Sequence, residues 1–482
     1  MSVDAIPEIP GGNLLGHMHL FQHQRLPMLL DAMRLGEVSR MRLLAKSLLV
    51  VSGARAAHEV LVEKAKQFEK SPGLRLLLYY LAGDGLFTSE GELWRRQRRL
   101  MAPLFQPAQL SRYAGLMQGV ARRAVARWHD GERIDIAAET TRIAMGVVGK
   151  ALFDSDTFDE ADALGEALTE ALQWVDDHAG SPAILGHMAA LDAVHAAEPK
   201  LPEALRPYAK QLHDRLQEPF AIPGAHAPTL RAAIARLDAR IQQMIDERRA
   251  QGLSRDDLLT RLLAARDDEG GGVTMTDKQV RDEATTLFVA GHETTATALA
   301  WSFYLLGKHP EVRAAVQAEV DALETDPDFD MAMTRLPLTL RVFKEAMRLY
   351  PPVLVLARRS LEPVTIGGHA LPKHTVVFVS PWGVHRNPAY WDEPDRFDPD
   401  RFLPEREVAR HRSAWLPFGA GPRVCVGNHF AMLEGPIVMA TLMRNTHFEL
   451  APGLAVEPDS FATLRPRGGV PAVVRLRQRA SS

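Results

Sequence analysis

The stretch Phe418-Gly419-Ala420-Gly421-Pro422-Arg423-Val424-Cys425-Val426-Gly427 holds the only cysteine among 482 residues. A single cysteine in an intracellular protein usually has no special function, but its neighbours here favour one. Two glycines and a proline before the thiol predict a tight, stiff loop. The following residues, from Gly427 to Arg444, have a helical pattern, so the sulfur lies where free backbone N–H groups favour a thiolate. With the nearby cation of Arg423, the stretch predicts a thiolate ligand for a flat, bulky group.

This loop resembles the haem-ligand loop of the cytochromes P450, whose pattern is Phe-x-x-Gly-x-Arg-x-Cys-x-Gly. Every fixed position is met, by Phe418, Gly421, Arg423, Cys425 and Gly427. The resemblance implies that Cys425 is the axial ligand of the iron of haem b (iron protoporphyrin IX), where thiolate electron donation favours O–O cleavage. It also implies a mainly α fold with small β-sheets (α+β). In that fold, a triangular prism, the haem lies between a long central helix and the cysteine loop.

The composition favours one catalytic unit in a reducing compartment. No linker, low-complexity block or repeat divides the chain, so we expect residues 1–34 to be a proline- and glycine-containing lead-in and residues 35–482 to form a single P450 catalytic domain. Lys+Arg 57 nearly balance Asp+Glu 60, which argues against a nucleic-acid partner. One cysteine excludes an internal disulfide and suits the cytosol. Without a signal peptide or an apolar run near ~18 residues, we predict a soluble, cytoplasmic protein with no membrane span.

The remaining pattern is mostly helical, with a few short strands in pairs. We expect strands at Val38–Leu43 and Ser47–Ser52, followed by a helix over Ala54–Lys64. Further strands are expected at Val364–Ile366 and Thr375–Val379, with Gly367-Gly368 as the hairpin turn, and at Phe448–Ala451 and Val473–Leu476 as a closing pair.

One long helix is expected from a capping box at Thr276 to Lys308, which makes it nearly 50 Å long at ~1.5 Å per residue. Its middle reads Ala290-Gly291-His292-Glu293-Thr294-Thr295. A glycine and threonines are poor helix formers, so this segment is either a kink tolerated by packing or a place where Gly291 lets a flat cofactor or O2 approach. It resembles the P450 motif Ala/Gly-Gly-x-Asp/Glu-Thr-Thr/Ser. The resemblance implies that Glu293 and Thr294 deliver protons to O2, whereas His292 is a packing or solvent-facing residue.

Further charged residues match P450 positions that hold the loop or the cofactor. Glu345 and Arg348, together with Arg401 in Pro399-Asp400-Arg401-Phe402, resemble the family's structural triad, a buried ion network that locks the thiolate loop. Trp94, Arg98, Arg358 and Arg423 are the expected ligands of the haem propionates, with Arg359 as an alternative to Arg358. Arg95, Arg96 and Arg99 form either a solvated helix face or a docking patch for an acidic electron-transfer protein.

The expected substrate walls are apolar. By the same resemblance they comprise Leu287, Phe288, Val289, Ala290, Val353, Leu354, Val355 and Phe461. Such walls suit a hydrophobic small molecule, such as a fatty acid or terpenoid. We expect a monooxygenase that hydroxylates or epoxidises it with O2 and electrons from a ferredoxin or flavodoxin and its reductase. An isomerase or dehydratase that needs no electrons, or a haem-based binder or gas sensor, stays open. The entrance around residues 176–219 and the role of Pro436 are left without a prediction.

Overall fold

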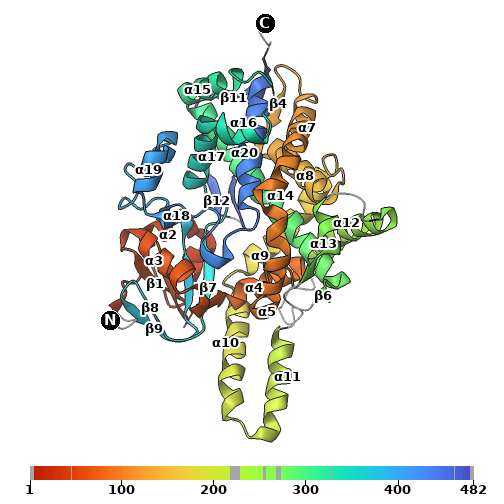
Figure 1. Cartoon of the computed structure of the whole chain (residues 1–482). Coiled ribbons are helices and arrows are strands. Elements are labelled where there is room, and N and C mark those ends of the chain that lie inside the picture. Colours follow the sequence, from red (N-terminus) through yellow and green to blue (C-terminus); the bar gives the residue numbers. More distant parts are fainter. Residues whose placement is uncertain are drawn as a thin grey trace.

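Short apolar strands from distant parts of the chain form one five-stranded sheet. The computed structural model describes residues 5–44, 46–217, 228–252, 257–267, 273–325, 327–460 and 462–477. The strands are β1 (Val38–Leu43), β2 (Lys46–Val51), β3 (Phe68–Lys70), β7 (Leu356–Ser360) and β10 (Val376–Val379), in the order β1-β2-β10-β7-β3. Figure 1 places this sheet next to α2 (Arg25–Arg34) and α3 (Ala54–His58), on one side of a larger helical region. The predicted mainly α fold with small sheets is confirmed.

The hairpin at Gly367-Gly368 has a different second strand from the one predicted. β8 (Val364–Ile366) pairs with β9 (His369–Leu371), directly across the two-glycine turn. The predicted partner, β10, instead pairs with β2 in parallel and with β7 antiparallel. A two-residue turn can join only strands that follow each other at once. Val377 and Val379 of β10 are fully buried, which suits a strand with neighbours on both sides.

The remaining strands and the first helix agree with the sequence, with one local change. β11 (Thr446–Leu450) pairs with β14 (Pro471–Leu476), as predicted for the closing pair. The helix expected over Ala54–Lys64 ends as an α-helix at His58 and continues as the π-helical turn η2 (Glu59–Glu63). The widened turn lies against the cysteine loop, so the irregularity occurs where the helix meets the candidate site.

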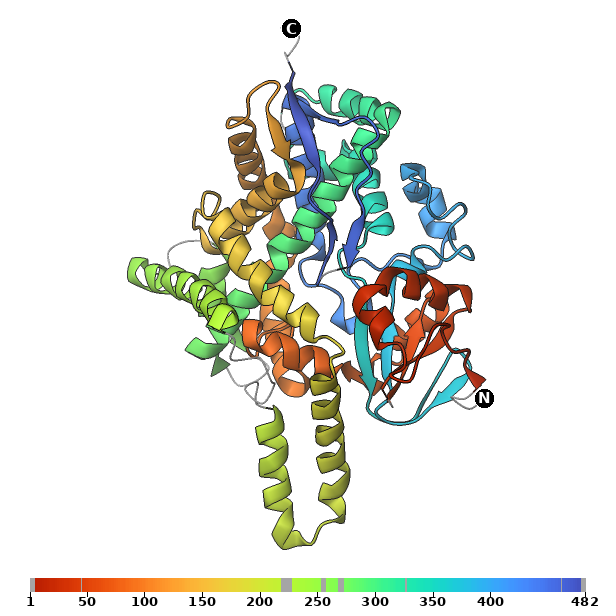
Figure 2. The ribbon, with the colours of Figure 1, turned by 180° about the vertical axis from the view of Figure 1, so that it is seen from behind.

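The predicted long helix is α14 (Asp277–Lys308), and it runs through the middle of the helical region (Figure 2). Its capping box is formed as expected, with the Thr276 hydroxyl accepting from the Gln279 N–H and the Gln279 side chain accepting from the Thr276 N–H. α14 packs along α8 (Ile136–Phe153). An added Cβ at Gly291 would lie 3.0 Å from a methyl group of Val148 in α8. Gly291 therefore permits close packing of these two helices, which agrees with the packing interpretation of this segment.

Residues between α9 (Ala161–His178) and α12 (Pro228–Gln251) include a helical hairpin that projects from the body (Figure 2). Its arms are α10 (Pro182–Ala197) and α11 (Arg206–Gln217). Ile184 and Met188 of α10 are buried at its base, next to α4 (Pro72–Ala82). The hairpin occupies the part of the chain for which the sequence allowed no prediction of shape.

The last long helix, α20 (Asn428–Asn445), continues through Pro436. Proline lacks the N–H that would donate to the carbonyl of Met432. α20 nevertheless stays helical because α7 (Ala114–Val125), α14 and α17 (Pro337–Leu349) pack around it. Among the helices that the structure describes, none combines the length and apolar content that crossing a bilayer requires.

Candidate functional site

Gly421 determines the conformation of the cysteine loop, and no other residue would fit at this position. Gly421 has a φ of +70°, and an added Cβ would overlap the carbonyl oxygen of Leu61 in η2. The Cys425 N–H donates to the carbonyl of Phe418 at 2.9 Å, which closes the loop. The Phe418 ring in turn packs edge-on against Trp415, with the ring centres 6.1 Å apart. These contacts hold the thiol three residues before the start of α20.

The Cys425 thiol is accessible to solvent although protein atoms surround it on most sides. Burial raises the pKa of the thiol above its ordinary value. The N–H of Gly427 and the charge of Arg98 act in the opposite direction and favour the thiolate. The loop therefore offers one reachable sulfur, with a cation and a helix N-terminus beside it.

Four residues that are predicted to bind the haem propionates lie close to this thiol and are called the cage below: Trp94, Arg98, Arg358 and Arg423. Arg98 is close enough for its charge to interact with Cys425, and burial lowers the pKa of its guanidinium. The guanidinium of Arg423 lies 4.5 Å from the centre of the Trp94 ring. Arg423 also forms a bidentate ion pair with Glu90, with both N–O distances at 2.6 Å. No pattern in the sequence marks Glu90 as a partner of Arg423.

Arg358, rather than Arg359, is the member of the cage contributed by β7. Arg359 is paired with Glu69 at 2.6 Å, whereas Arg358 donates only to the carbonyl of Ala357. Burial, with a smaller effect from the charge of Arg423, lowers the pKa of Arg358 to about 10. Within the described residues, neither Arg98 nor Arg358 forms an ion pair with a carboxylate, although the charge of Glu90 acts on Arg358. Two such cations beside one reachable thiol fit a group that carries two carboxylates, as haem does.

The long helix α14 carries Ala290 and Thr294 one turn apart. Ala290 is exposed although its neighbours in the helix are largely buried. The Thr294 hydroxyl donates to the carbonyl of Ala290 at 2.9 Å. Phe288 and His292 lie on the opposite face, where the Phe288 ring packs against Phe153 of α8. His292 is fully buried, as the packing interpretation predicts.

The other predicted wall residues differ in exposure. Leu287 and Leu354 are buried, and Val289, Val353 and Val355 are half-buried. Phe461 lies outside the described residues. Because Phe288 points toward α8, it does not line the same face as Ala290, and we leave it out of the wall.

The carboxylate of Glu293 is held by the C-terminal strand β13 (Leu464–Pro466) and its preceding residue. One of its oxygens accepts from the Arg465 side chain at 2.6 Å and from the Thr463 hydroxyl at 2.8 Å. The sequence predicted Glu293 as half of an acid–alcohol pair with Thr294, but it held no signal for these two partners.

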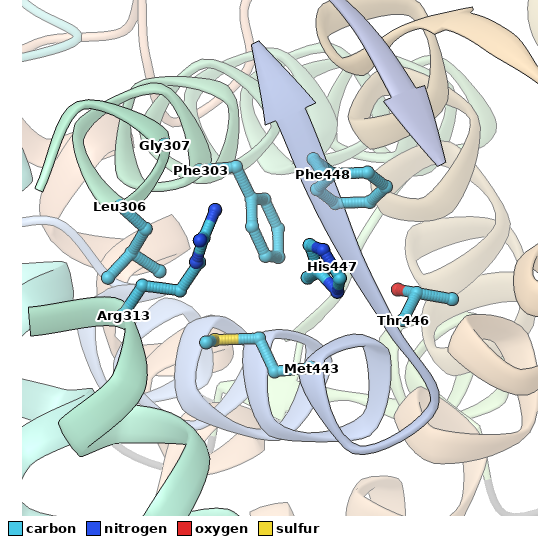
Figure 3. A pocket seen from close by; sticks show the side chains of 8 residues that line it. All are labelled: Phe303, Leu306, Gly307, Arg313, Met443, Thr446, His447 and Phe448. Atoms are coloured by element: carbon cyan, nitrogen blue, oxygen red, sulfur yellow. The ribbon is translucent and has the colours of Figure 1, made fainter. Parts of the chain in front are cut away.

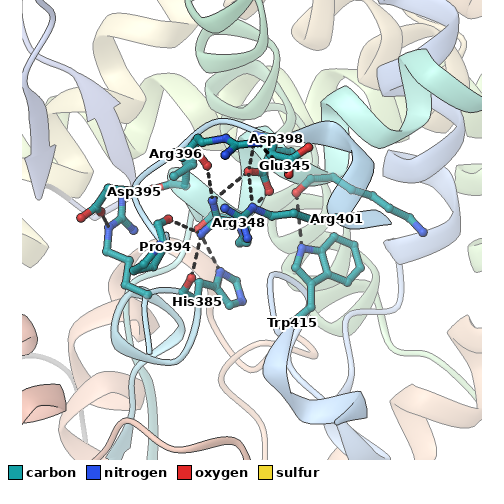
Figure 4. A network of polar contacts seen from close by, with 12 residues as sticks. Glu345, Arg348, His385, Pro394, Asp395, Arg396, Asp398, Arg401 and Trp415 are labelled. Atoms are coloured by element: carbon teal, nitrogen blue, oxygen red, sulfur yellow. Dashed lines mark hydrogen bonds and ion pairs between the residues drawn. The ribbon is translucent and has the colours of Figure 1, made fainter. Parts of the chain in front are cut away.

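The predicted structural triad is assembled and buried (Figure 4). Arg348 and Glu345 are both fully buried and form two hydrogen bonds of 2.6 and 2.8 Å. Arg401 approaches the same carboxylate at 3.5 Å and donates to the carbonyl of Glu393 at 2.9 Å. Burial raises the pKa of Glu345, an effect that the two arginines oppose.

His385 connects this triad to Leu416, whose carbonyl accepts from the N–H of Gly419 in the cysteine loop. Sequence reasoning missed this histidine. Its Nδ1 lies 3.2 Å from the carbonyl of Arg348, and its Nε2 accepts from the N–H of Leu416 at 2.7 Å. Burial lowers the pKa of His385 to about 3, so the ring is neutral and accepts through Nε2. A histidine in the segment Trp382-Gly-Val-His385 has no pattern of its own that would mark this role.

A separate hollow between α14, α20 and β11 is unrelated to this chemistry (Figure 3). It is lined by Phe303, Leu306, Gly307, Arg313, Met443, Thr446, His447 and Phe448. Its volume of about 10 Å³ is too small for a substrate.

A reachable thiol, a cage of cations and a long helix with a small exposed residue define a haem-thiolate type of site. Residues 7–469 match the family model described as Cytochrome P450, and the chain belongs to the cytochrome P450 family. It is 33% identical over 452 residues to cyclooctatin synthase of Streptomyces melanosporofaciens, covering 93% of this chain and 91% of that protein. It is also 33% identical over 385 residues to pentalenene oxygenase of Streptomyces avermitilis, covering 80% and 78%.

The fold agrees with solved structures of the family. A crystal structure of the cytochrome P450DA heme domain matches with a TM-score of 0.80 and 26% identity, covering 98% of both chains. The cofactor is therefore haem b, as predicted. The chain is a monooxygenase that uses O2, a hydrophobic substrate and a redox partner, so the monooxygenase prediction is confirmed over the isomerase and sensor alternatives.

Proposed function

We propose that this monooxygenase oxidises a terpenoid, with Cys425 as the axial thiolate of the haem. The observation that carries the site assignment is the single reachable cysteine beside Arg98 and Arg358, two cations that form no ion pair with a carboxylate in the described chain. The terpenoid class is supported by cyclooctatin synthase and pentalenene oxygenase, which share 33% of their aligned residues with this chain. The apolar residues next to Ala290 agree with such a substrate.

Each group of residues has a distinct task in this proposal. Arg98, Arg358 and Trp94 hold the propionate side of the cofactor, whereas Arg423 is shared with Glu90. When bound, haem supplies the activation of O2, and thiolate ligation favours O–O cleavage. Thr294 and Glu293 provide a hydroxyl and a carboxylate for proton delivery. Leu287, Val289, Ala290, Val353, Leu354 and Val355 form the proposed apolar wall that holds the substrate.

We expect the haem-loaded enzyme to oxidise a mono-, sesqui- or diterpene when it is supplied with a ferredoxin, its reductase and oxygen-18 gas. A substrate should first displace the water on the haem, which changes the Soret spectrum, and mass spectrometry should then find one oxygen-18 atom in the product. Pentalenene and straight-chain fatty acids are the two probes to compare. Turnover of fatty acids alone would contradict the terpenoid assignment while leaving the monooxygenase chemistry intact.

We further propose that the electron donor is an acidic ferredoxin that docks on α5 (Gly91–Met101). Arg95 and Arg99 are exposed on this helix, and Arg95 forms an ion pair with the exposed Glu92. Arg96 differs from the prediction in that it donates to the carbonyl of Thr274. The patch proposed for the partner therefore consists of the two exposed arginines of this helix, Arg95 and Arg99.

Reversing the charges of Arg95 and Arg99 to glutamate should raise the Michaelis constant for the ferredoxin by about 10-fold at low salt, because rim charges mainly control association. The same double reversal at Arg34 and Arg396, two exposed arginines away from α5, is the matched control. This control changes the net charge by the same amount and should leave the Michaelis constant for the ferredoxin unchanged. An equal effect of both pairs would mean that overall charge, and not this patch, attracts the donor.

A further inference from the structure

The carboxylate of Glu293 is oriented by residues outside its own helix. Arg465 and Thr463 both bind the same oxygen of Glu293. The Thr294 hydroxyl, by contrast, is used by the carbonyl of Ala290 within α14. In the described structure, no hydrogen bond joins Glu293 to Thr294, the two residues proposed to work as an acid–alcohol pair. The ion pair is shielded, since the Glu293 side chain is 12% exposed and that of Arg465 is 24% exposed.

The strand that carries Arg465 is fixed on both sides of the candidate substrate region. The carbonyl of Leu464 accepts from the Trp301 indole of α14 at 2.7 Å. The N–H of Leu464 donates to the carbonyl of Pro352 at 3.0 Å, immediately before the wall residues Val353 to Val355. Leu464 is itself fully buried. Arg465 therefore projects from a backbone that cannot move independently of α14 and of the wall.

Arg465 also contacts a third element. One of its terminal nitrogens lies 3.4 Å from the hydroxyl of Thr169 in α9. α9 leads into the projecting α10–α11 hairpin and contacts α4 through the edge-on rings of Trp174 and Tyr80. A single guanidinium thus joins the proposed acid on α14 to a helix that borders the proposed entrance.

We infer that Arg465 is a positioning residue for proton delivery, which holds the Glu293 carboxylate in one orientation and couples that orientation to the position of α9. The inference rests on the proposed function of Glu293. A half-buried carboxylate that loses its cation is less stable in the charged form, so it takes up a proton more readily. The groups that face Glu293 are Arg465 and Thr463 from β13 and its preceding residue, and the buried His292 from α14. Burial lowers the pKa of His292, so His292 cannot replace the missing cation.

The test uses the haem-loaded full-length protein and two measurements. The first is the infrared band of a protonated carboxyl group near neutral pH, which requires no substrate. Arg465→Gln should show an additional band that disappears in the Arg465→Gln/Glu293→Gln double variant, whereas wild type and Arg465→Lys should lack it. The second is the fraction of the electrons supplied by ferredoxin that reduces oxygen to hydrogen peroxide instead of forming product. That share should rise several-fold in Arg465→Gln and return toward wild type in Arg465→Lys.

Two milder variants keep the inference testable if Arg465→Gln does not fold. Thr463→Val removes one hydrogen bond from the carboxylate and retains the cation, so it should leave the infrared band absent and raise peroxide release slightly. Thr169→Val cuts only the link to α9, and it should raise peroxide release without any carboxyl band. A wild-type-like peroxide share in Thr169→Val would overturn the coupling to α9. No new band and unchanged peroxide release in Arg465→Gln would overturn the positioning role, whereas failure of the proposed function would already appear as a wild-type enzyme that makes no oxygenated product.

Discussion

Cys425→Ser should abolish the thiolate-type red shift of the Soret band in the reduced, CO-bound protein. The shift arises from electron donation by a thiolate, and a serine oxygen donates far less. Because the chain has one cysteine, no other residue can supply a thiolate. Monooxygenase turnover should fall by at least about 100-fold, the scale expected when a group that acts directly at the reacting centre is lost. The reduced-CO spectrum of purified wild type and variant is the measurement.

The single cysteine also permits a test that does not depend on activity. The thiol of Cys425 is exposed in the described structure, so haem-free protein should take up one maleimide per chain. Haem-loaded protein should take up none, because the sulfur then binds the iron. Val424→Ala is the matched control, since it changes the same loop and leaves the thiol in place. Equal labelling with and without haem, or a red shift that persists in Cys425→Ser, would contradict the assignment.

Much of the candidate site was predictable because its residues lie close together in sequence or follow fixed spacings. The cysteine loop needs Gly421 for its positive φ and for its contact with Leu61, and the glycine is visible in the sequence although the contact is not. α14 was predictable because its capping box and its stop at His309-Pro310 are local signals. Such features depend on a few neighbouring residues and can be predicted without knowledge of the tertiary structure.

Features that depend on distant partners were not predictable. The sequence leaves two interpretations of Gly291 open, close packing or a gap for a cofactor, and the residue that packs there, Val148, lies more than a hundred residues away. The hairpin at Gly367-Gly368 was assigned the wrong second strand because β10 is a central strand of another sheet. Glu90 and Arg465 are ordinary charged residues in the sequence, and only the fold brings them to Arg423 and Glu293. Long-range pairs of this kind carry no local pattern.

The second large effect is expected at Arg348. This side chain is fully buried and donates to both oxygens of Glu345. It also donates to the carbonyls of His385, Pro394 and Arg396, at 2.9, 2.6 and 3.1 Å. Arg348→Ala would remove two hydrogen bonds from a buried carboxylate, which would keep only the Asp398 N–H and the more distant Arg401. Three carbonyls would also lose this donor. We expect it to lower the free energy of unfolding by about 3–5 kcal/mol, which is a large part of the stability of a typical domain.

Because the triad is connected to the cysteine loop, loss of haem should be the first measurable effect of replacing Arg348. His385 accepts from Leu416 and contacts the carbonyl of Arg348, so a shift at Arg348 reaches the cysteine loop through one imidazole ring. Arg348→Ala should therefore accumulate with little or no haem, measured as the Soret to protein absorbance ratio after expression with added haem precursor. Arg348→Lys should also fail in large part, because an ammonium cannot make the two-pronged contact with Glu345 and reach three carbonyls as well.

A matched control lies within the same network. The side chain of Arg396 is 59% exposed and pairs with the exposed Glu393, while its backbone carbonyl accepts from Arg348. Arg396→Ala removes an arginine from the network and keeps that carbonyl, so it should change stability by no more than about 0.5 kcal/mol and load haem normally. Normal haem content in Arg348→Ala would mean that the triad does not hold the loop. In the described part of the chain, no hydrogen bond or ion pair joins Glu345, Arg348 or Arg401 to the proposed substrate wall. A variant that did load haem should therefore also retain its substrate preference, which separates a structural role from a catalytic one.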